Sequence, residues 1–124
     1  MNKKFYITTA IPYVNAAPHI GHTLEFVQAD AIARIHRLLG DETYLLSGGD
    51  ENALKNVQAA EKAGVPLQEF IDTNATLFSN VAKRLNVQFD VFQKGSDTKT
   101  HFPASQKLWS LCQQAGKKKK KEYE

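Results

Sequence analysis

The amino-acid sequence predicts an α/β domain built on a parallel sheet with helices on both faces. Short runs of β-branched and aromatic residues alternate with longer segments of helical periodicity, in the order β-α-β-α-α-β-α. Gly and Pro residues separate many of these segments. Strands that alternate with helices pair in parallel through right-handed crossovers, so we expect the predicted strands to share one sheet.

The first predicted strand, Phe5–Ile11, ends at Pro12, because proline cannot donate to a ladder. Little polarity interrupts this run, which favours a strand buried on both faces. A helix is predicted over 21–39, with Asp30 and Arg34 paired on its outer face. Its apolar stripe, at spacings of three and four, consists of Leu24, Val27, Ala31, Ile35 and Leu38.

The same patterns predict the remaining elements. Two further strands are expected at Glu42–Ser47 and Val87–Phe92. Helices are expected at 53–63, 66–86 and 103–115. The acidic and polar residues 50–52 can cap the first of these helices, and the last one carries Leu108, Leu111 and Cys112 on one side.

The charge of the chain is unevenly distributed. Residues 1–116 carry 11 Lys or Arg and 11 Asp or Glu, whereas residues 117–124 carry five Lys and two Glu. The net charge of +3 therefore comes from the end of the chain, and it does not indicate a nucleic-acid-binding face. We predict one domain over 1–116 and a solvated lysine-rich tail over 117–124. Non-specific RNA binding by Lys117–Lys121 is the functional alternative.

A single cysteine, Cys112, excludes an internal disulfide and a cysteine-based zinc site. Its apolar position predicts a small buried side chain. No segment is long enough to cross a membrane, and Thr8, Thr9 and Pro12 interrupt the N-terminal apolar run that a signal peptide would need. We therefore expect a cytoplasmic protein.

The tetrapeptide His19-Ile20-Gly21-His22 joins the first predicted strand to its helix. A strand that turns into a helix at a glycine presents backbone N–H groups to phosphate, and two imidazoles add donors for developing charge. Taken alone, the tetrapeptide is equally consistent with ordinary histidines at a helix start.

A second polar segment, Gly48-Gly49-Asp50-Glu51-Asn52, follows the second predicted strand. Sequence alone favours a turn with a helix cap. If the first two strands are neighbours, Asp50 lies on the same rim as His19 and His22, where its carboxylate could hold an ammonium group or a ribose hydroxyl. Nearby, Ala10, Ile11 and Tyr13 could line a small apolar pocket, although sequence alone favours the core.

The segment Ile7–Asp30 closely resembles the start of the methionyl-tRNA synthetases, which are class I aminoacyl-tRNA synthetases with a HIGH signature. The resemblance extends loosely through Gly116. It implies the first half of a Rossmann-like catalytic domain that activates methionine with ATP, accompanied by Mg²⁺, and transfers it to tRNA.

The resemblance also implies roles for individual residues. His19 and His22 would be catalytic and would contact ATP, with Gly21 and Glu25 also on the nucleotide side. Ala10, Ile11, Tyr13 and Asp50 would bind methionine, with Asp50 on its ammonium group.

The sequence departs from the family in two ways. Asn52 and Ala53 stand where the second motif usually has His and Gly. The zinc-bearing insertion, the Lys-Met-Ser-Lys-Ser loop and the second half of the sheet have no counterpart in these 124 residues. The family's strand order then leaves the first strand as an edge, which predicts self-association and, for the chain by itself, weak or incomplete activity.

Two alternatives stay open at this point. A small HxGH nucleotidyltransferase would use a phosphorylated acceptor, although Asp50 and the loop at 12–17 argue against it. A non-catalytic module would bind a nucleotide or a partner through the sheet edge or the lysine tail.

Overall fold

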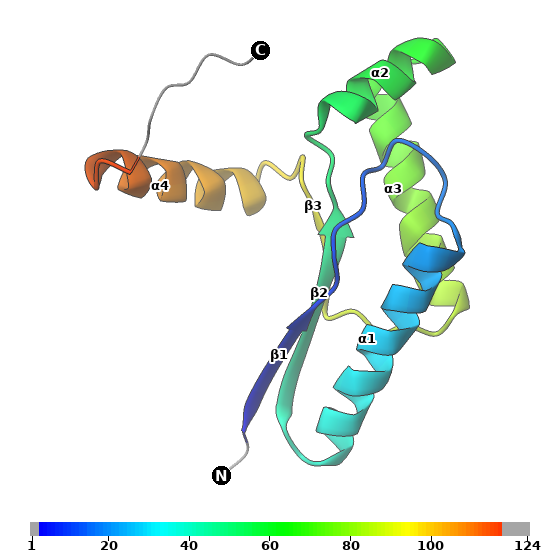
Figure 1. Ribbon diagram of the computed structural model, residues 1–124, viewed down its shortest axis with the longest axis vertical. Coiled ribbons are helices and arrows are strands. Elements are labelled where there is room, and N and C mark those ends of the chain that lie inside the picture. Colours follow the sequence, from blue (N-terminus) through cyan, green and yellow to red (C-terminus); the bar gives the residue numbers. More distant parts are fainter. Residues whose placement is uncertain (1–2, 118–124) are drawn as a thin grey trace.

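The computed structural model describes residues 3–117, and the end of the predicted lysine-rich tail, residues 118–124, lies outside them. The predicted order of elements is confirmed within this range (Figure 1). The strands are β1 (Lys4–Thr8), β2 (Glu42–Gly49) and β3 (Val91–Lys94). The helices are α1 (Ile20–Leu38), α2 (Leu54–Ala63), α3 (Leu67–Arg84) and α4 (His101–Gln114).

The three strands form a parallel sheet in the order β1-β2-β3. Tyr6 pairs with Tyr44 between β1 and β2, and Leu46 pairs with Val91 between β2 and β3. The predicted α/β fold is therefore confirmed, and β1 is an edge strand as expected. β1 stops at Thr8 rather than at Ile11, although the Thr9 N–H still donates to Leu46 O at 3.1 Å.

Two helices, α1 and α3, cover one face of the sheet, whereas α4 projects from the other side (Figure 1). No residue of α4 is buried, and the predicted apolar side of that helix is largely exposed, with Cys112 only half-buried. On the same open side, Tyr6 stacks on Tyr44 while remaining 62% exposed. The prediction that β1 is buried on both faces is therefore wrong.

The larger core cluster joins α1, α3 and the segment before β3. Its fully buried aromatic side chains, Phe26 and Phe78, dominate the packing because aromatic rings bury the most apolar area. The other buried members are Val14, Ile71, Ala75, Ala82 and Val87.

Helix α1 turns a different face to the sheet than the one predicted. Its buried residues are Phe26, Ala29, Ala33 and Asp30. The two alanines pack with Leu45 and Ile7, because small side chains let the helix approach the strands closely. The predicted stripe faces outward, with Leu38 at its end 87% exposed.

Asp30 lies on the inner face of α1, not on the outer face. Its pair with Arg34 is present at 2.6 Å, and its second carboxylate oxygen accepts the Gln88 N–H at 3.0 Å. Gln88 thus bonds to a side chain instead of a neighbouring strand. This explains why β3 begins at Val91, four residues later than predicted. Backbone hydrogen bonding to β2 starts at Asp90, the residue before β3, whose N–H donates to Leu45 O.

Candidate active site

The segment that follows β1 meets the second polar segment, residues 48–52, at the carboxyl edge of the sheet. After β1, the chain runs along this edge, and the N–H of Asp50 donates to Pro12 O at 2.8 Å. Tyr13 and Asp50 form an isolated parallel bridge. A buried contact of 2.7 Å between the hydroxyls of Thr9 and Ser47 joins the same two segments.

His19 and His22 form one stacked unit at the start of α1. His19 is the N-cap residue, and its Nδ1 accepts the Gly21 N–H at 3.1 Å. Nδ1 of His22 accepts the His19 N–H at 3.2 Å, and the two ring centroids lie 3.7 Å apart. A ring whose Nδ1 accepts carries its proton on Nε2. Each neutral histidine therefore keeps an Nε2–H donor for a ligand.

The surroundings of His22 favour its neutral form. Its ring meets the buried Phe78 edge-on, with 5.1 Å between the centroids. Partial burial, followed by the charge of His19, lowers the pKa of His22, and Glu25 opposes this shift. The histidine pair at the start of α1 therefore offers hydrogen-bond donors, and the His22 ring carries no fixed positive charge.

Gly21 lies directly against the capping side chain of His19. A Cβ at this position would lie 3.0 Å from Cε1 and 3.1 Å from Nδ1 of His19. A larger residue would therefore push the His19 ring out of its capping position. Glu25, predicted on the nucleotide side, has a definite partner in this chain, because its Oε1 accepts the Ala10 N–H at 2.6 Å.

Asp50 combines a fixed backbone with an available side chain. Besides the bond to Pro12, its carbonyl accepts Nδ2 of the buried Asn56 at 2.8 Å. Across residues 3–117, no hydrogen bond or ion pair engages the Asp50 carboxylate. Asp50 and Tyr13 border a cavity of about 520 Å³ whose other lining residues are Asn52, Ala53, Leu54, Lys55 and Gln58.

The remaining predicted methionine-binding residues lie on the rim outside this lining. Ala10 and Ile11 are both exposed, and Ile11 is 54% exposed. They are neither core residues nor part of a closed apolar pocket. Neither do the polar residues 50–52 cap α2, because its N-cap is Ala53, which has no side-chain bond. Asn52 instead donates from Nδ2 to Gly95 O at 3.0 Å.

Comparison with known proteins identifies the family. The family model described as "tRNA synthetases class I (M)" matches residues 5–124. The chain belongs to this family. A methionine–tRNA ligase of Mycobacterium bovis is 45% identical over 114 residues, covering 92% of this chain and 22% of that protein. A methionine–tRNA ligase of Brucella suis is 43% identical over 107 residues, which cover 86% of this chain and 21% of that protein.

Solved structures agree with this class I synthetase assignment. Mycobacterium tuberculosis methionyl-tRNA synthetase bound by methionyl-adenylate superposes with a TM-score of 0.89 at 44% identity, covering 92% of this chain and 22% of that one. The LeuRS of Agrobacterium radiobacter K84, in a ternary complex with tRNA and LeuAMS, superposes with a TM-score of 0.84 at 25% identity. The match covers 93% of this chain and 15% of that one. The chain thus spans about a fifth of the length of the methionine–tRNA ligases that it matches.

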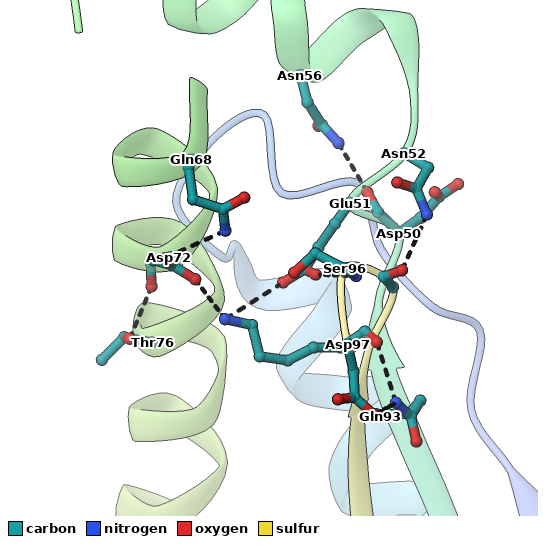
Figure 2. Close-up of polar contacts among 12 residues, drawn as sticks. Asp50, Glu51, Asn52, Asn56, Gln68, Asp72, Thr76, Gln93, Ser96 and Asp97 are labelled. Atoms are coloured by element: carbon teal, nitrogen blue, oxygen red, sulfur yellow. Dashed lines mark hydrogen bonds and ion pairs between the residues drawn. The ribbon is translucent and has the colours of Figure 1, made fainter. Parts of the chain in front are cut away.

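One structural feature next to the candidate site was not predicted from the sequence. Glu51, next to Asp50, turns its carboxylate inward toward α3, whereas the Asp50 carboxylate points away from it (Figure 2). A signal for this was present, because β2 alternates with a period of two and its buried positions Leu45, Ser47 and Gly49 lead directly to Glu51.

Between residues 3 and 117, no three His, Cys, Asp or Glu side chains gather as a metal ion would require. Over the same range, no helix has the length and apolar character needed to cross a membrane.

Proposed function

We propose that this chain forms the first half of the catalytic domain of a methionine–tRNA ligase. That enzyme activates methionine with ATP to methionyl-adenylate and then transfers methionine to tRNA. The observation that supports the proposal is the junction of Tyr13 with Asp50, whose carboxylate has no partner within residues 3–117, on the loop that leads on to His19 and His22. The names of the relatives and the methionyl-adenylate complex agree with it.

The Asp50 carboxylate supplies the charge that a methionine ammonium group needs, and the fixed Asp50 backbone limits the entropy lost on binding. A methionine carboxylate oxygen attacks the α-phosphorus of ATP, and the bond to pyrophosphate breaks. The Nε2–H groups of His19 and His22 donate to the phosphate oxygens as charge develops there. Mg²⁺ arrives with ATP.

The proposal also includes tRNA as the acceptor, a cytoplasmic location, and self-association through the free edge of β1. We expect the chain by itself to bind ATP and methionine weakly and to activate methionine slowly. This expectation follows from its span, which is about a fifth of the length of its relatives.

Methionine-dependent exchange of pyrophosphate into ATP tests the proposal, together with the methionine-induced rise in melting temperature. Asp50→Asn keeps the shape of the side chain and removes its charge, so we expect loss of the methionine-induced shift with an unchanged melt of the free chain. Glu61→Gln on the exposed side of α2 is the matched control. Stabilisation by a phosphorylated acceptor instead of methionine would favour the small nucleotidyltransferase.

A further inference from the structure

The carboxylate of Glu51 is the most deeply buried negative charge near the candidate site. Its side chain is 0% exposed. Oε2 accepts the Ser96 N–H at 2.6 Å, whereas Oε1 has no hydrogen-bond partner in the described part of the chain. A buried carboxylate with one unsatisfied oxygen is costly unless a positive charge lies close to it.

Lys94, the last residue of β3, supplies that positive charge. Its Nζ lies 4.0 Å from Oε1 of Glu51 and also forms a close ion pair with Asp72 of α3. The hydrogen bond to Asp72 and the charge of Glu51 both raise the pKa of Lys94, against the effect of its burial. Besides Lys94, Asp72 has Gln68 and solvent as partners, whereas within residues 3–117 Glu51 has only Ser96 (Figure 2).

The segment that follows Lys94 packs directly on residues 49–52, which include Asp50 and are called the Asp50 corner below. A Cβ at Gly95 would lie 3.2 Å from both Glu51 N and Gly49 O, so the two backbones touch. Asn52 and Glu51 each bond to this segment, at Gly95 O and Ser96 N. The position of the Asp50 corner therefore depends on how the residues after β3 are held.

We propose that Lys94 is a positioning residue that compensates the buried Glu51 carboxylate and thereby fixes the corner from which Asp50 meets the amino-acid substrate. Lys94 does not touch the substrate. The inference rests on the proposed function for the substrate, but the fixing of the corner can be measured without any ligand.

The ligand-free test is hydrogen exchange of backbone amides in the 124-residue chain. The Asp50 N–H donates to Pro12 O and the Ser96 N–H donates to Glu51, so both report on the corner. In Lys94→Met we expect these two amides to exchange about tenfold faster or more, while Ile7 in β1 is unchanged. Lys94→Arg keeps the charge and should restore exchange to within about threefold of wild type.

Two further variants separate charge compensation from general damage. In Glu51→Gln/Lys94→Met the buried charge is gone, so we expect slower exchange at Asp50 than in Lys94→Met alone. Lys62→Met removes an exposed lysine of α2 and should change nothing. Should Lys94→Met fail to fold, the double variant and Lys94→Arg still decide, because the proposal requires both to retain a protected Asp50 amide.

Binding measurements give the second readout. Lys94→Met should weaken methionine binding about tenfold and ATP binding less than about twofold, because the histidine corner lies on α1. Equal losses for both ligands, unchanged exchange at Asp50, or no rescue by Lys94→Arg would overturn the inference. A wild-type chain that binds neither ligand contradicts the proposed function, whereas the exchange data still decide the role of Lys94.

Discussion

The carboxylate of Glu25, in the second turn of α1, accepts the backbone N–H of Ala10, 2.6 Å away, where the chain has just left β1. Ala10 lies on the free edge of the sheet, and its N–H would otherwise have no strand to donate to. Glu25 therefore ties the first helix to the segment predicted to bind methionine. The side chain of Glu25, which the resemblance places on the nucleotide side, thus contacts the segment that it predicts to bind methionine.

Replacing Glu25 by Ala should loosen residues 10–13 and lower the unfolding free energy by about 1 kcal/mol, because the lost bond is charged but solvent-exposed. We expect methionine affinity to fall more than ATP affinity, and Glu25→Gln, which retains an acceptor, to lose less of both. Isothermal titration with each ligand and urea unfolding measure these effects, with Glu61→Ala as the control. A selective loss of ATP binding would restore the nucleotide-side role.

The lowered pKa of His22 makes the stability of the chain depend on pH. Because the folded value lies below the ordinary 6.5, the unfolded chain binds more protons between the two values. Stability is therefore fully present above the unfolded pKa and is lost as the pH falls through 6.5 toward the folded value. Thermal melts from pH 8 to pH 5 should show a smaller acid-side loss in His22→Asn than in wild type. A flat wild-type profile would contradict the prediction.

Much of the fold was predictable because its signals are local. Glycine and proline stops and short apolar runs mark most of the elements, and the parallel order follows from their alternation. The buried face of α1 was not predictable, because the helix has two apolar faces and the sheet selects the one with Ala29 and Ala33. A second apolar stripe, from Leu24 to Leu38, fits the helical period equally well but remains outside.

The site shows the same division between local and tertiary signals. The corner at His19 and His22 and the position of Asp50 follow from strand ends in a parallel sheet. The partnership of Glu51 with Lys94 joins residues 43 positions apart, and nothing in the local composition pairs them. The late start of β3 depends likewise on Asp30, which lies 58 positions before Gln88.

Removal of the Asp30 charge should destabilise the whole domain. Asp30 is 6% exposed and bonds both Arg34 and the Gln88 N–H, while Arg34 also donates to Asn86 O. In Asp30→Asn the side-chain NH₂ group faces another hydrogen-bond donor in this buried network. We therefore expect the unfolding free energy to fall by about 2 kcal/mol and the Gln88 amide to exchange faster. Urea midpoints measure the loss, and the exposed Glu69→Gln is the control. A midpoint equal to wild type would show that the amide replaces the carboxylate without cost.

The free edge of β1 should make the chain self-associate. Glu42 N–H donates to Lys3 O and Thr9 N–H donates to Leu46 O, so alternate residues of β1 bond to β2. The intervening residues, such as Tyr6, turn their backbone groups to the free edge, and the predicted apolar stripe of α1 is also exposed. An unpaired edge on a chain with exposed apolar surface favours pairing with a second copy.

Sedimentation velocity over a range of concentrations measures this association, and we expect the weight-average mass to rise with concentration. Tyr6→Pro removes one edge N–H that β2 does not use, so it should shift the dimerisation constant about tenfold or more while leaving the β1–β2 ladder intact. Leu54→Lys removes an exposed apolar side chain on α2, away from β1, and should have little effect. An equal weakening of self-association in both variants would indicate non-specific apolar contact. A wild-type chain that stays monomeric at every concentration would contradict pairing through β1.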